Sequence, residues 1–164
     1  RKIGFICGPR SHTSLEERYM GYRQALLYAD IPVDENLVTF CGPTYTVEKG
    51  YEEVKKMVKN GVLEKMNKVS AIFTSSDFLA IGLMKAIEEM DLAFKDISII
   101  GFDDIQMAKY TNPSLSTVRI FKDEMGILAG DRLQELIEGK KIKPIKLIVS
   151  VELIKRKSLK TINK

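Results

Sequence analysis

The fold is decided by residues 69–104, which read VSAIFTSSDFLAIGLMKAIEEMDLAFKDISIIGFDD. Residues 69–74 form a short apolar run of the length of a strand, residues 77–90 carry apolar side chains at helical spacing, and residues 97–101 form a second apolar run. This second run is hydrophobic on both faces, which is typical of a strand in a parallel sheet that is covered on both sides. The stretch therefore predicts a strand, a helix and a further parallel strand.

The same unit occurs earlier in the chain. We expect a strand at residues 2–7, followed by a helix whose beginning is indicated by Ser14 and Glu17, an S-x-x-E capping box. A second strand at residues 37–41 leads into a helix that ends near residues 60–61. This alternation predicts an α/β fold, a parallel sheet flanked by helices on both faces. Ligands bind beyond the carboxyl ends of such strands, here at residues 8–13, 42–46, 75–77 and 103–104.

The pattern changes after Asn112 and Pro113. Residues 115–118 are a brief extended stretch, residues 123–137 have the spacing of a helix, and residues 147–154 form an apolar run that we interpret as a strand. The helix has a substantial apolar face, which must be buried against something.

Composition limits the function classes. The 164 residues are 45% hydrophobic, which suffices for one α/β domain, and no apolar run is long enough to span a bilayer. The net charge of +4 is spread over mixed charges, so a nucleic-acid surface is not implied. One exception is the end of the chain, which carries Lys155, Arg156, Lys157, Lys160 and Lys164 without any acid. This basic tail would either attract phosphates or form a solvated terminus. Because the chain opens directly on an expected strand, we expect further residues before Arg1 in the natural protein.

The two cysteines, Cys7 and Cys41, are too few for a disulfide framework. Both close short apolar runs, where a buried, reduced thiol fits. If those runs are neighbouring strands, a disulfide under oxidising conditions stays an alternative.

Polar residues at the expected strand ends are candidates for ligand binding. Asp103 and Asp104 follow a buried strand, where carboxylates accept hydrogen bonds from ligand hydroxyls or hold Mg²⁺. Asp104 also suits an N-cap of a following short helix. Arg18 flanks the apolar stripe of the first helix and offers a planar fork of donors. Ser76 is placed to cap the third helix and to offer a hydroxyl.

Catalytic and cofactor motifs are not found. His12 is the only histidine, which argues against a multi-histidine metal site and a Ser-His-Asp triad. The chain has no G-x-G-x-x-G and no G-x-x-x-x-G-K-[ST] loop. We therefore expect no enzyme activity, no cofactor and no metal.

The chain resembles the lac/galactose repressor family in an ordered set of segments that spans nearly its whole length. They are IGFI at 3–6, ERYMGY at 17–22, AIFTSSD at 71–77 with AIG at 80–82, DISIIGFDD at 96–104, PSLSTV at 113–118, MG at 125–126 and KRKS at 155–158. The chain departs from the family where Val118 is followed by Arg119 without a proline, and around Ser75 and Ser76.

The resemblance implies a periplasmic-binding-protein-like, Rossmann-like lobe. Residues 1–118 would be the second lobe of an effector-binding domain, and residues 119–164 a segment that crosses to a first lobe, with its helix at 123–137, strand at 147–154 and basic tail. The first lobe and the DNA-binding headpiece would lie outside this sequence. The implied ligand contacts are Arg18, Asp103, Ser76 and Tyr45. The implied homodimer contacts are Phe78, Ile81, Met84 and Tyr110.

The resemblance implies an effector-sensing part of a cytoplasmic transcription regulator. The effector would be a sugar, a sugar phosphate or a nucleobase, and some members bind a phosphorylated partner protein instead. A periplasmic sugar-binding protein of a transport system is the alternative, and a Mg²⁺-dependent phosphoacceptor or small enzyme that uses Asp103 and Asp104 is a third. Without the first lobe, we expect the helix at 123–137 to be covered by a neighbouring chain, by swapping, or to be poorly ordered.

Overall fold

The computed structural model describes residues 2–44, 46–62, 69–90, 97–141 and 143–160 and contains one six-stranded sheet. The strand order is β2-β1-β3-β4-β5-β6, and all neighbours are parallel except β5 and β6, which are antiparallel. The strand bounds are β1 Ile3–Cys7, β2 Val38–Phe40, β3 Ala71–Thr74, β4 Ser98–Phe102, β5 Ser116–Ile120 and β6 Val151–Ile154. The predicted α/β fold is confirmed, with an antiparallel strand added at one edge.

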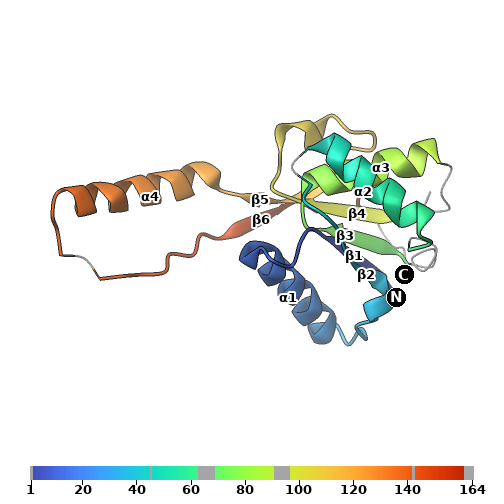
Figure 1. Ribbon diagram of the computed structural model, residues 1–164, viewed down its shortest axis with the longest axis horizontal. Helices are drawn as coiled ribbons and strands as arrows, with labels where there is room; N and C mark the ends of the chain where they lie inside the picture. The colour runs from blue at the N-terminus through green and yellow to red at the C-terminus, as the bar shows by residue number, and fades with distance from the viewer. Residues whose placement is uncertain (1, 45, 63–68, 91–96, 142, 161–164) are drawn as a thin grey trace.

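Helices cover both faces of this sheet (Figure 1). Helix α1, Thr13–Tyr28, lies on one face, and α2, Val47–Lys59, and α3, Asp77–Glu89, lie together on the other. On the α1 face Phe5 stacks on Tyr19 and Tyr22, with ring centroids 5.7 and 4.9 Å away. On the other face Ile6, Ile72, Leu79 and Leu83 are among the fully buried residues of a larger apolar cluster. Each face of the sheet thus has its own core.

Helices α2 and α3 approach each other at two glycines. A Cβ on Gly82 would lie 2.4 Å from the backbone carbon of Gly50, and one on Gly50 would lie 2.3 Å from the Phe78 carbonyl oxygen. The two backbones are therefore too close for any larger residue at either position.

Two predicted details are wrong. Helix α1 begins at Thr13 with His12 in extended conformation before it, and no side chain caps it. Ser14 therefore lies inside the first turn and cannot serve as the cap of the predicted capping box. The predicted strand 147–154 is paired only from Val151, because its partner β5 ends at Ile120, opposite Val151.

Helix α4, Lys122–Ile137, extends away from the sheet on the continuation of β5, and the chain returns from it into β6 (Figure 1). We call residues 122–141 and 143–150 the arm. None of the α4 residues is buried, and Ile127, Leu133, Leu136 and Ile137 are each more than half exposed. Among the described residues this helix lacks a packing partner that buries it, as expected, while what covers it stays a prediction.

Cys7 ends β1 and Cys41 directly follows the neighbouring strand β2, so the two cysteines lie close together, as one alternative required. The Cys41 amide donates to the Cys7 carbonyl oxygen over 2.8 Å at the end of the β1–β2 pair. Both thiols are free, Cys7 buried and Cys41 partly so. In the described part of the chain, no helix has the length and apolarity needed to cross a membrane.

Candidate functional site

The strand order places a crevice at the carboxyl ends of β1 and β3. From β1 the chain passes along α1 to the sheet edge at β2 and returns along α2 to β3, on the other side of β1. The strand order reverses here, and such a reversal is where open α/β sheets bind ligands. The Gly8 amide donates to Ser75 Oγ over 3.0 Å across this point. A cavity of ≈ 220 Å³ opens beside it, lined by Gly8, Pro9, His12, Ser14, Leu15, Arg18, Pro43, Thr44, Ser75, Ser76, Phe78 and Asp103.

Arg18 is held rigidly in this cavity. Its guanidinium donates to the Ser75 carbonyl oxygen and to Asp103 Oδ1, the latter over 3.2 Å. The same group lies over the Phe102 ring, 3.8 Å from the centroid, and the side chain is 16% exposed. A stacked, ion-paired arginine is pre-organised to donate to a polar ligand, which favours the predicted binding role over a solvated surface charge.

Asp103 completes the pair from the end of β4. Its backbone φ of 108° is in a region that side chains rarely adopt, and its carboxylate faces Arg18. Burial raises the pKa of Asp103, although the nearby charges of Arg18 and Lys122 partly oppose this. The pair thus presents one donor and one acceptor group side by side, a combination that suits ligand hydroxyls or polar edges.

Of the other two predicted ligand residues, Ser76 and Tyr45, the structure describes only Ser76. Ser76 lines the cavity, and its Oγ accepts a hydrogen bond from the Leu79 amide over 3.3 Å, so it is also the predicted cap of α3. Tyr45 lies outside the described residues. Its neighbour Thr44 lines the cavity and is 9% exposed, a site residue that the sequence indicated only as part of the loop after β2.

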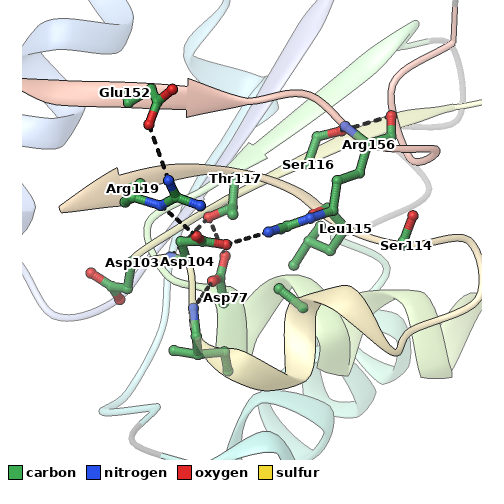
Figure 2. Close-up of polar contacts among 12 residues, drawn as sticks. Asp77, Asp103, Asp104, Ser114, Leu115, Ser116, Thr117, Arg119, Glu152 and Arg156 are labelled. Carbon is green, nitrogen blue, oxygen red and sulfur yellow. Dashed lines mark hydrogen bonds and ion pairs between the residues drawn. The ribbon is translucent and has the colours of Figure 1, made fainter. Parts of the chain in front are cut away.

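Asp104 does not cap the following short helix, contrary to one prediction. Its oxygens contact Arg119 Nε over 2.8 Å and Arg156 Nη2 over 2.6 Å (Figure 2). Burial favours a raised pKa, but the hydrogen bonds from Arg156 and Arg119 outweigh it and keep the pKa of Asp104 below its ordinary value. With both oxygens held by guanidinium groups, the geometry does not support the Mg²⁺ alternative.

Arg156 also corrects the expectation for the basic tail. Its side chain is 13% exposed and donates to the Leu115 carbonyl oxygen as well as to Asp104. Ser158 is buried and donates to the Ile99 carbonyl oxygen over 2.6 Å. Arg156 and Ser158 are therefore packed on the sheet and not frayed, whereas Lys155, Lys157 and Lys160 are exposed.

Asp77 is a further residue at this end of the sheet, which the sequence analysis indicated only as part of residues 75–77. It is fully buried at the start of α3, where its carboxylate accepts from Thr117 Oγ1 over 2.6 Å and from the Ile105 amide over 2.8 Å. Gly101 leaves room for it, because a Cβ there would lie 2.1 Å from Asp77 Oδ1. Burial raises the pKa of Asp77 to about 6. Asp77 thus connects α3 to the loop that carries Asp103.

The predicted dimer residues have different surroundings. Ile81 is 8% exposed and belongs to the core under α3, Phe78 and Met84 are partly exposed, and Tyr110 is 79% exposed. Phe78 also lines the cavity. Their role in an interface stays a prediction.

Comparisons with known proteins identify relatives along almost the whole chain. A family profile described as periplasmic binding protein-like domain matches residues 1–159. The transcriptional regulator AscG of Escherichia coli K12 is 36% identical over 160 residues, which are 97% of this chain and 45% of AscG. The repressor PurR of Klebsiella pneumoniae is 31% identical over the same shares of the two chains. The chain thus spans about half the length of the curated relatives it matches.

Solved structures of transcription regulators resemble this chain in fold as well. A complex of the transcriptional regulator CelR with cellobiose superposes with a TM-score of 0.84 at 27% identity, over 96% of this chain and 46% of CelR. A sugar-binding regulator of the LacI family from Escherichia coli, in complex with phosphate, gives a TM-score of 0.76 at 37% identity, over 96% of this chain and 54% of that one.

Proposed function

We propose that this chain is the effector-sensing lobe of a transcription regulator of the lac/galactose repressor type. It belongs to the family of periplasmic binding protein-like domains. The observation that carries the proposal is the Arg18–Asp103 pair beside a cavity at the strand-order reversal. Residues 1–118 would form the second lobe of the effector domain. Residues 119–164 would include the segment that crosses to the first lobe, from which the chain returns to this sheet at β6.

The charge of the site supports a small polar effector. Arg18 and Asp103 largely neutralise each other, and hydroxyl-bearing Ser14, Thr44, Ser75 and Ser76 surround them. Such a set of donors and acceptors suits a sugar, a sugar phosphate or a nucleobase. CelR was solved with cellobiose and the Escherichia coli regulator with phosphate, which agrees with this range of chemistry.

The partners follow from the same proposal. The chain would form a homodimer through α3 and residues 105–110, and DNA contact would come from a headpiece outside these residues. Such a regulator acts in the cytoplasm, senses its effector and catalyses no reaction. The relatives named above are regulators, so they favour this function over the transport alternative.

Removing either member of the pair is expected to weaken effector binding strongly without unfolding the lobe. Arg18→Ala and Asp103→Ala each remove charge-assisted hydrogen bonds worth about 1.5–3 kcal/mol, which corresponds to a loss of affinity of about tenfold or more. The measurement is an NMR titration of the amide signals of Ser75, Ser76 and Asp103 with cellobiose, glucose 6-phosphate and adenine as probes.

Arg23→Ala is the matched control, because Arg23 lies on the same helix but is exposed and does not line the cavity. It should bind the responding probe as the parent does. Amide shifts that persist in both Arg18→Ala and Asp103→Ala would contradict the site.

A further inference from the structure

Asp104 joins three segments that are far apart in the chain. Its carboxylate, only 6% exposed, bonds to Arg119 on β5 and to Arg156 just after β6 (Figure 2). Arg156 is anchored a second time on the Leu115 carbonyl oxygen over 2.7 Å, and Arg119 pairs with Glu152 of β6 over 3.2 Å. One carboxylate therefore fastens the end of β4 to the two strands at the sheet edge.

The backbone at this point is fixed as well. Asp103 and Asp104 have φ values of 108° and 45°, and consecutive non-glycine residues with positive φ persist only where their surroundings determine the conformation. The Asp103 amide donates to the Val118 carbonyl oxygen over 2.9 Å, and the Ile105 amide donates to Asp77 over 2.8 Å. Neighbouring carboxylates are thereby directed apart, that of Asp103 to Arg18 and that of Asp104 to the two arginines.

The two strands fastened by Asp104 are the ones that carry the arm. β5 ends at Ile120, and α4 begins two residues later; the returning chain enters β6 at Val151. The arm makes few other polar contacts with the body: Lys146 lies 3.9 Å from Glu17, and Lys122 donates to the Asp103 carbonyl oxygen over 2.9 Å. The direction of the arm therefore depends on how β5 and β6 are held.

We propose that Asp104 is the positioning residue that fixes the arm relative to the loop carrying Asp103. A displacement of Asp103 is passed through one peptide bond to Asp104, and from there through two charge-assisted hydrogen bonds to β5 and β6. We call Asp104 with Arg119 and Arg156 the joint. The role of this joint in effector sensing rests on the proposed function. The joint itself depends only on residues of this chain and can be tested without a ligand.

The decisive variant is Asp104→Asn. Asparagine adopts positive φ as readily as aspartate does, so the change removes the charge and leaves the backbone conformation accessible. The amide offers one uncharged acceptor oxygen in place of two charged ones, so both charge-assisted hydrogen bonds at this position are lost or weakened.

The experiment measures the arm by double electron–electron resonance, with spin labels on Lys59→Cys at the end of α2 and Asp131→Cys on α4, both exposed positions. We expect a narrow distance distribution in the parent and a wider one in Asp104→Asn, because the neutral amide makes weaker hydrogen bonds to the two guanidinium groups than the carboxylate does. Asp123→Asn, an exposed position on the first turn of α4, is the matched control and should leave the width unchanged.

A double-mutant cycle that combines Asp104→Asn with Arg156→Gln distinguishes positioning of the arm from a general loss of structure. If Asp104 acts through this arginine, the widening in the double variant should be smaller than the sum of the widenings in the two single variants, because both changes remove the same hydrogen bond. If Asp104→Asn fails to fold, Arg119→Gln, at the more exposed end of the cluster, should widen the distribution instead.

An unchanged width in folded Asp104→Asn, an equal widening in Asp123→Asn, or additive effects with Arg156→Gln would each overturn the proposal. Failure of the ligand titration, with the widening present, would overturn effector sensing and leave the joint established.

Discussion

Replacing Gly82 with alanine is expected to lower the free energy of unfolding by about 3 kcal/mol, the upper end for overpacked cores. The added Cβ would lie 2.4 Å from the backbone of Gly50 and Tyr51, so it cannot be accommodated by rotating a side chain. Helices α2 and α3 must separate instead, which opens the core beneath them. Urea denaturation followed by circular dichroism measures the change.

Gly21→Ala is the matched control. Gly21 is also helical, but a Cβ there has no neighbouring atom within 4 Å. Because alanine is the better helix former, this variant should be as stable as the parent or more stable by up to about 1 kcal/mol. Equal stability of Gly82→Ala and Gly21→Ala would show that α2 and α3 do not pack as described.

Asp77 is expected to make stability depend on pH. The folded state raises its pKa from 3.8 to about 6, so the folded protein binds the proton more tightly than the unfolded chain does. The protonated Asp77 carboxyl therefore stabilises the folded state. This stabilisation is fully present below about pH 4 and is lost as pH rises through about 6. A shift of about two units corresponds to about 3 kcal/mol.

The test compares the parent with Asp77→Asn by urea denaturation between pH 4 and 7. Asparagine cannot ionise, so the free energy of unfolding of the variant, relative to that of the parent, should rise by about 3 kcal/mol over this range. Altered hydrogen bonds add a constant offset that does not depend on pH. Asp131→Asn, an exposed position on α4, should show no such trend. A pH-independent difference between the parent and Asp77→Asn would mean that Asp77 titrates normally.

Local patterns sufficed to predict most of the fold. The apolar runs and helical spacings correspond to β1 to β5 and to α1 to α4, because the apolar residues of each element recur at the period of a strand or a helix. The antiparallel pairing of β6 was missed, since a short apolar run does not indicate the direction of its partner. The beginning of α1 was misplaced because several residues around Ser14 are compatible with a cap.

The candidate site was predictable to the extent that it depends on strand ends. Arg18 and Asp103 meet as expected, since both lie at the carboxyl edge of the sheet. The partners of Asp104 were not predictable, because Arg119 and Arg156 lie 15 and 52 residues away in the chain. Arg156 in particular sits in a run of basic residues that resembles a solvated terminus, and only the pairing of β6 turns it inward.

The neighbouring positions of Cys7 and Cys41 have a consequence for chemical labelling. Burial raises the pKa of both thiols, that of Cys41 to about 12. The thiolate is the nucleophile, so at neutral pH both groups are almost entirely in the unreactive protonated form. Maleimides and methanethiosulfonates should therefore modify an introduced surface cysteine far faster than either native one. The chain can carry a probe at a chosen position with its own cysteines in place.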